Sequence, residues 1–251
     1  MIKIKAFLIH LFISAVIVLS FLSLVFFIWY PSPYLEMEGG YAIIAMLVGV
    51  ALVLGPLLTF IVYKPGKKGL IFDLYFIALV QIAAFTYGAH AIFTERPQYV
   101  AFVVGQFRLI PASMIKTEEL KIPSLDNGVL SKPKFVYVEM PEDTDKHNEI
   151  VFSAMAGKDA ELYPELYREY EDFSHIITAD IKHQLSLDNL IKRYPSIENK
   201  IKTIEKDYKT TREQLIFYPI LGKEKSFIMV LSKQDAGIIE ILKFSPWEDN
   251  L

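Results

Sequence analysis

Apolar residues are concentrated in three long runs near the start of the chain. Residues 6–30 and 41–63 contain no Asp, Glu, Lys or Arg, and residues 70–93 contain only Asp73. A helix needs about 20 apolar residues to cross the hydrocarbon core of a bilayer. The pattern therefore predicts three N-terminal transmembrane helices, at residues 6–30, 41–63 and 70–93, which together make a membrane region of residues 1–93.

Turn formers and charges separate the three runs. Pro31, Pro33, Gly39 and Gly40 lie between the first two, and the segment 64–69 lies between the second and the third. The first run is far longer than the apolar stretch of a signal peptide, which is about 7–15 residues, and no small-residue cleavage site follows it. We therefore expect an uncleaved anchor.

The pattern changes completely after residue 93. Residues 94–251 carry 21 Lys and Arg and 26 Asp and Glu, whereas residues 1–93 carry only eight charged side chains. Runs rich in β-branched and aromatic residues predict strands at 99–110, 134–140, 214–221, 226–231 and 237–244. Helical spacing predicts helices at 160–170 and 186–209, the second broken by Pro195, and residues 110–133 read as an extended loop with a helical turn. Helices between early and late strands predict an α+β domain with a mainly antiparallel sheet.

Basic residues predict the orientation in the membrane. Lys3 and Lys5 precede the first run, and Lys64, Lys67 and Lys68 lie between the second and the third, whereas the loop between the first two has no Lys or Arg. Cytoplasmic loops carry the excess of Lys and Arg. The N-terminus is therefore expected in the cytoplasm, and three crossings place residues 94–251 on the other side of the membrane, which in a Gram-negative cell is the periplasm.

Small residues within the runs mark candidate helix–helix contacts. Gln81 lies near the middle of the third run, and three small residues follow it at helical spacing: Ala84, Gly88 and Ala91. Ala45 and Gly49 form a similar pair in the second run. Small residues let helix backbones approach closely, and a buried amide can donate a hydrogen bond across the contact. These residues either pack the three helices together or form a groove for a partner's transmembrane helix, and both uses are compatible.

A search for catalytic, cofactor and metal motifs gives no enzyme prediction. The nucleotide-binding, serine hydrolase and zinc protease signatures are absent, and there are no cysteines. His175, Asp180 and His183 are close in sequence, but they lack the spacing of a familiar metal site, so a solvated helix face is expected. The acidic balance of residues 94–251 argues against nucleic acid as a partner. We expect neither an enzyme nor a cofactor.

A series of motifs in the first 110 residues resembles the TfpX/TfpZ family of type IV pilin accessory proteins of Gram-negative bacteria. They are GPLLTFIVYKPGKK at 55–68, FDL at 72–74, Gln81, Tyr87-Gly88, and TERPQY at 94–99. The remainder agrees in length and general character. The resemblance implies an inner-membrane protein that assists the assembly or stability of a cognate type IV major pilin, in a chaperone-like role.

Two other classes of function stay open at the level of sequence. A membrane-anchored sensor would bind a small ligand with its exported domain, but the predicted cytoplasmic segments are too short to hold an output domain. An enzyme would need a catalytic motif that the chain does not show.

The predicted architecture is compatible with a pilin as partner. A pilin carries an apolar helix in the membrane and an exported head, so a protein with helices in the bilayer and a domain outside it can contact both parts of the pilin.

Overall fold

The computed structural model describes residues 3–247, so residues 1–2 and 248–251, at the ends of the two predicted regions, lie outside it. Three helices are long and apolar enough to cross a membrane: Lys3–Trp29, Tyr41–Val62 and Leu70–Thr94. They agree with the predicted spans 6–30, 41–63 and 70–93 to within a few residues at each end. The first is α1 (Lys3–Leu24) with a π-helical end, Val25–Trp29, and the third is α5 (Leu70–Thr94).

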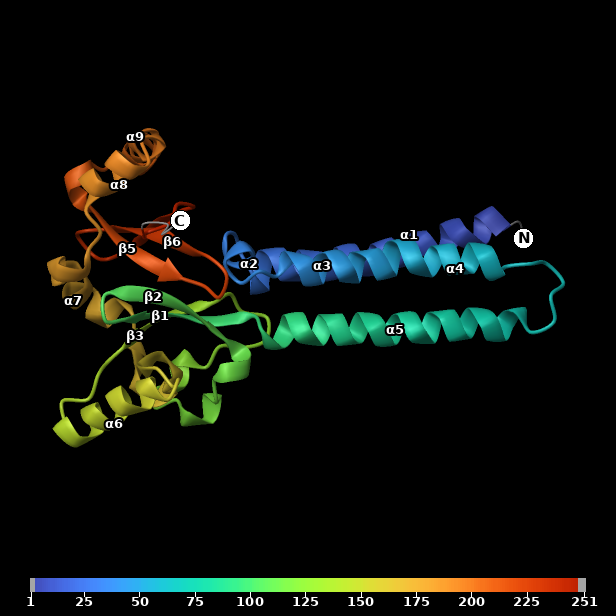
Figure 1. The fold of residues 1–251 in the computed structure, drawn as a ribbon, viewed down its shortest axis with the longest axis horizontal. Coiled ribbons are helices and arrows are strands. Elements are labelled where there is room, and N and C mark those ends of the chain that lie inside the picture. The colour runs from blue at the N-terminus through green and yellow to red at the C-terminus, as the bar shows by residue number, and fades with distance from the viewer. Residues whose placement is uncertain (1–2, 248–251) are drawn as a thin grey trace.

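The second long helix lies between the other two. It consists of α3 (Tyr41–Val48), a π-helical stretch (Gly49–Leu54) and α4 (Gly55–Val62), and both α1 and α5 pack against it. Its inner positions Leu47 and Ala51 join Val18 and Val25 of the first helix and Ile92 of α5 in one apolar cluster. The three helices run side by side away from the rest of the molecule (Figure 1).

The remaining chain forms a head built on one seven-stranded sheet with the order β4-β3-β1-β2-β5-β6-β7. The strands are β1 (Pro97–Val103), β2 (Gln106–Pro111), β3 (Lys134–Val138), β4 (Tyr167–Glu169), β5 (Leu215–Leu221), β6 (Ser226–Ser232) and β7 (Ile238–Leu242). The sheet is mixed, because β1 pairs with β3 and β2 pairs with β5 in parallel, whereas the other neighbours are antiparallel. The expected α+β head is present, but the prediction of a mainly antiparallel sheet left out these two parallel pairings.

The strand predicted over residues 99–110 is in fact a hairpin. Val104 and Gly105 both have positive φ, 42° and 75°, and they turn the chain between β1 and β2. Both flanking segments are rich in β-formers, so the pattern of residue types alone does not show the reversal. A Cβ on Gly105 would collide with the side chain of His183, so this turn depends on glycine.

Four helices belong to the head: α6 (Thr144–Met155), α7 (Ser174–Ala179), α8 (Leu187–Arg193) and α9 (Ser196–Tyr208). The predicted break at Pro195 is confirmed, because it separates α8 from α9. The helix predicted over 160–170 is wrong: two short 3-10 turns, Ala160–Leu162 and Pro164–Leu166, lead into β4. Tyr167 is fully buried in β4 opposite Val138, so tertiary packing overrides the helical spacing of its neighbours.

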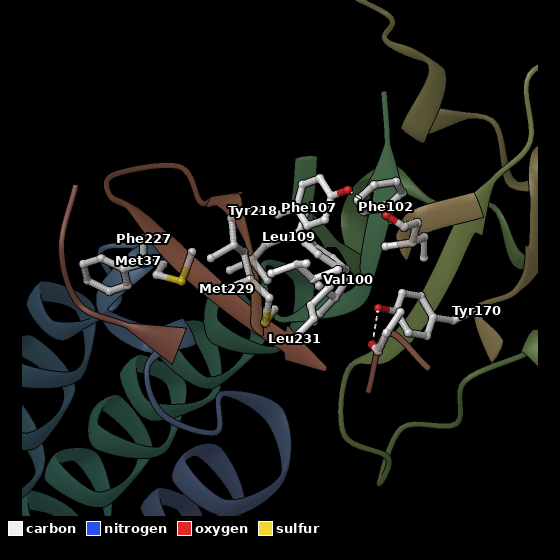
Figure 2. Close-up of a cluster of buried hydrophobic side chains, with 14 of the residues drawn as sticks. Met37, Val100, Phe102, Phe107, Leu109, Tyr170, Tyr218, Phe227, Met229 and Leu231 are labelled. Atoms are coloured by element: carbon white, nitrogen blue, oxygen red, sulfur yellow. Dashed lines mark hydrogen bonds between the residues drawn. The ribbon is translucent and has the colours of Figure 1, made fainter. Parts of the chain in front are cut away.

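Alternate side chains of each strand enter two different cores. One face of the sheet is covered by α8 and α9, through residues such as Ile197 and Ile201, and by the loops around α6. The other face is concave: Tyr170, just after β4, donates a hydrogen bond of 2.8 Å to the carbonyl oxygen of Ala236, just before β7. The two edges of the sheet therefore approach each other, and the aromatic core in Figure 2 lies inside the curl.

Candidate functional site

A polar cluster connects all three apolar helices. His10 Nδ1 lies 2.6 Å from Thr59 Oγ1, and His10 Nε2 lies 2.8 Å from Gln81 Oε1. The Gln81 amide donates to the carbonyl oxygen of Ala51 at 2.8 Å and to Ser14 Oγ at 3.3 Å. Four polar side chains and one backbone carbonyl therefore hold the first, second and third helices together.

The hydrogen bonds of the cluster use its polar groups fully. The amide oxygen of Gln81 can only accept, so His10 Nε2–H donates to it, and His10 Nδ1 shares a hydrogen bond with the hydroxyl of Thr59. Both ring nitrogens and the Gln81 amide are thereby satisfied. Unsatisfied polar groups are costly in hydrocarbon, so such a closed network is compatible with burial between membrane helices.

The residues predicted as a helix–helix interface are divided by the structure. Gln81 lies in the polar cluster, and Gly88 lies against Leu47 of the second helix, where an added Cβ would come within 3.2 Å of Leu47 Cδ1. Ala91 is half-buried beside them, whereas Ala84 is exposed. In the second helix Ala45 is exposed, and nothing lies within 4 Å of a Cβ built on Gly49.

Three members of the polar cluster were not among the predicted site residues: His10, Ser14 and Thr59. A signal existed, because His10 and Ser14 are four residues apart and so share one face of the first helix. What the sequence did not give is the rotation of each helix, since apolar residues surround these positions on every side. The contact of Gly55 with the Gln81 amide is equally a product of packing.

A groove opens beside the cluster, between α1 and α5. Its volume is about 360 Å³, and its walls are apolar side chains such as Ile17 and Phe85. His10, Ser14 and Gln81 also line it. The groove therefore offers an apolar surface at about the middle of the helices, with polar side chains in its lining.

The segment between the first two long helices is docked on the head. It contains the short helix α2 (Tyr34–Met37), whose Tyr34 and Met37 are both buried in the concave core. Met37 is seen there in Figure 2. The carbonyl oxygen of Met37 accepts hydrogen bonds from the backbone N–H groups of Glu224, at 2.8 Å, and Lys225, at 3.1 Å. The loop between two apolar helices thus supplies part of the core of the head.

Charged groups fasten the same segment from outside. Glu36 pairs with Lys225 at 3.0 Å and with Lys243 at 2.8 Å, and the hydrogen bond from Lys243 is the largest cause that lowers its pKa. Glu38 accepts the backbone N–H of Lys223 at 3.3 Å, but burial raises its pKa from 4.5 to about 7. Two carboxylates two positions apart are therefore shifted in opposite directions.

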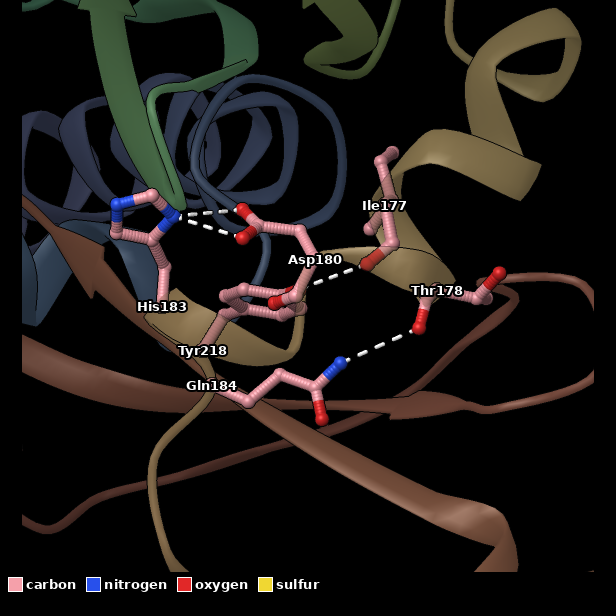
Figure 3. A network of polar contacts seen from close by, with 6 residues as sticks. All are labelled: Ile177, Thr178, Asp180, His183, Gln184 and Tyr218. Atoms are coloured by element: carbon pink, nitrogen blue, oxygen red, sulfur yellow. Dashed lines mark hydrogen bonds and ion pairs between the residues drawn. The ribbon is translucent and has the colours of Figure 1, made fainter.

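The three residues considered for a metal do not form one site. Asp180 and His183 pair, with His183 Nδ1 at 2.8 and 2.9 Å from the two carboxylate oxygens (Figure 3). Among the described residues, His175 contributes only its backbone carbonyl oxygen, which accepts a hydrogen bond from the Thr178 hydroxyl. Tyr218 of β5 donates to the carbonyl oxygens of Ile177 and Asp180, so this network fixes the end of α7 on the sheet. Within residues 3–247 no group of three or more His, Cys, Asp or Glu could hold a metal ion.

Comparison with known proteins gives consistent names. Residues 1–39 match the family described as fimbrial assembly protein FimB. The fimbrial assembly proteins of serogroups E1 and I of Dichelobacter nodosus are 26% and 25% identical over 244 residues, which cover 96% of this chain and 94% of each relative. The fimbrial assembly protein of serogroups C1 and C2 is 35% identical over 114 residues, 45% of this chain and 87% of that relative. No solved structure matches the chain.

Proposed function

Because the chain belongs to the fimbrial assembly protein family, we propose that it assists the assembly of a type IV fimbria by stabilising the cognate major pilin in the membrane. The family membership is the observation that carries the proposal. It agrees with the broader expectation drawn from the sequence motifs, whereas the narrower TfpX/TfpZ identification stays a prediction. The action is chaperone-like and not enzymatic, in keeping with the absence of a catalytic motif in the sequence.

The proposed topology has three transmembrane helices and an exported head. Lys3 and Lys5 lie at the start of α1, and Lys64, Lys67 and Lys68 lie at the α4–α5 connection, so the positive-inside rule places both basic segments in the cytoplasm. The segment 31–40 is then exported together with the head to which it docks, in the periplasm of the bacterial inner membrane. Alkaline phosphatase fused after Trp247 should be active, and fused after Lys68 inactive. The reverse pattern would contradict this topology.

The arrangement of the two regions supports a chaperone for a membrane-anchored subunit. A pilin awaiting assembly has an apolar helix in the membrane and a head outside it. In this protein, three apolar helices are connected to a head on which the α2 segment docks, so one molecule can contact both parts of a pilin. We propose that the groove beside His10 and Gln81 receives the apolar helix of the pilin.

Deletion of the gene tests the function in a strain that makes its own matched pilin. Surface fimbriae should decrease while the pilin transcript keeps its level, because the protein acts after synthesis. Complementation with the complete chain should restore the fimbriae. Unchanged fimbriae after deletion would overturn the proposal.

A further inference from the structure

Strand β7 leaves one edge of the sheet open. It is the terminal strand, and within residues 3–247 its only strand partner is β6. An open edge presents unpaired backbone N–H and C=O groups, which are a template for another strand. The other end of the sheet is shorter, because β4 has only three residues and pairs with Val136–Val138 of β3.

Two hollows follow this edge along its length. One, of about 580 Å³, lies at the start of β7, and the other, of about 590 Å³, lies at its end, and both contain Ile238. The pairing with β6 skips Ile239, whose carbonyl oxygen accepts a hydrogen bond from Tyr208. The regular part of the edge is therefore Glu240–Leu242, which lies along the second hollow.

The second hollow is lined by both apolar and charged side chains. The apolar lining includes Tyr34 from the segment between the long helices, Phe135 from β3 and Ile241, and the charged lining is Lys200, Glu240 and Lys243. Phe135 has no partner in β4, because β4 pairs only with Val136–Val138 of β3. The hollow contains Phe135 and residues of β7, so it lies between the two edges of the curled sheet. Tyr34 also belongs to the interface between α2 and the sheet, so the hollow continues an interface at which the chain already docks a segment by backbone hydrogen bonds to Met37.

We propose that this groove binds an extended segment of the exported part of the fimbrial subunit, which adds to β7 as an eighth strand. This inference rests on the proposed function and names the second contact with the same partner. Backbone hydrogen bonds to Glu240–Leu242 would hold the segment, and one apolar side chain would enter between Tyr34 and Phe135. The groove begins where the spans end, so it suits a partner that is itself anchored in the membrane.

Photo-crosslinking in cells tests the proposal with the complete protein and its matched pilin. A photoreactive amino acid replaces Ile238, on the open edge, and in the control it replaces Phe152, which is 68% exposed on α6. We expect an adduct with pilin from position 238 that is at least severalfold stronger than from position 152. An adduct of two copies of this chain would assign the edge to self-association and overturn the proposal, as would equal adducts from the two positions.

A pair of proline variants tests the hydrogen bonds themselves. Successive N–H groups of a strand point to opposite sides, so one of Glu240→Pro and Ile241→Pro breaks pairing with β6 and the other removes a donor only from the open edge. The variant that keeps its cellular level should lose the pilin adduct about two- to tenfold, as expected for one backbone hydrogen bond. An unchanged adduct in that variant contradicts strand addition. If deletion abolishes fimbriae but the adduct is absent, the function stands and this inference fails.

Discussion

The apolar helices and the head use the same kinds of side chain in opposite ways. In the helices Phe27 and Tyr87 are 72% and 80% exposed, while the polar Ser14 and Thr59 are buried. In the head Tyr99 and Phe107 are completely buried, and charged residues occupy the surface. A soluble protein seldom exposes so much contiguous apolar surface to water. In a bilayer, apolar side chains contact lipid, so their exposure carries no cost there. The two regions therefore have opposite exposed surfaces, and the surface of the long helices is of the kind that suits a bilayer.

The second lesson concerns what holds each region together. Apolar burial drives the packing of the head, whereas lipid offers no such force between membrane helices, where close packing and hydrogen bonds act instead. The long helices show both of these interactions: hydrogen bonds around His10 and Gln81, and close packing at Gly88.

Phe107→Ala should destabilise the head by about 3–5 kcal/mol, because it leaves a cavity in the aromatic core. Phe27→Ala in the first long helix removes the same side chain where it faces outward, so it should change stability by less than about 0.5 kcal/mol. Resistance of the detergent-purified protein to protease during denaturant titration measures both. Equal effects of the two substitutions would contradict the reversed use of aromatic residues in the two regions.

Met37→Ala should destabilise the head by about 2–5 kcal/mol, although the residue lies between two long apolar helices in the sequence. Its side chain is fully buried in the concave core (Figure 2). The control is Met46→Ala, on the second long helix, where the side chain is 72% exposed. The same protease assay should show cleavage within the head for the first variant alone. A head that keeps its resistance in Met37→Ala would show that α2 only rests on the surface.

Gly88→Leu should destabilise the helix packing by about 1–3 kcal/mol through overpacking against Leu47. Ala84→Leu, one turn away on the same helix, adds a side chain on an exposed face and should be nearly neutral. Thermal melting in detergent and the cellular level of each protein measure the difference. If Ala84→Leu proves the more harmful, a partner helix covers that face, and the assignment of the two positions must be exchanged.

The smallest effect is a dependence on pH between 5 and 8. The pKa of Glu38 is raised from 4.5 to about 7, so its protonated form stabilises docking, and this contribution is lost as pH rises through about 7. Glu36 has a lowered pKa, so its carboxylate stabilises docking at neutral pH. This stabilisation is lost only as pH falls below the ordinary carboxyl range. Thermal stability should therefore decline from pH 5 to pH 8, and Glu38→Gln should flatten the decline. A slope that is unchanged in Glu38→Gln would assign it to another group.

The sequence predicts the three long helices because their apolar runs need no tertiary partner to be recognised. It also predicts the break at Pro195, because a proline interrupts a helix through its own backbone geometry. It does not predict the parallel pairings of β1 with β3 and β2 with β5, since strand partners far apart in the chain are chosen by the whole sheet. Nor does it show that His10 and Thr59 meet Gln81, because that depends on the rotation of each helix.

The docking of α2 imposes an order on the making of the protein. Glu38 and its partner Lys223 are 185 residues apart, so Tyr34 and Met37 are synthesised long before their binding site is complete. Closing so long a loop is slow, and until it closes both side chains lack the core that buries them. A chain that stops before Lys225 never covers them. The same contact that completes the fold thus distinguishes a finished molecule from a truncated one, because Met37 is buried only in the finished molecule.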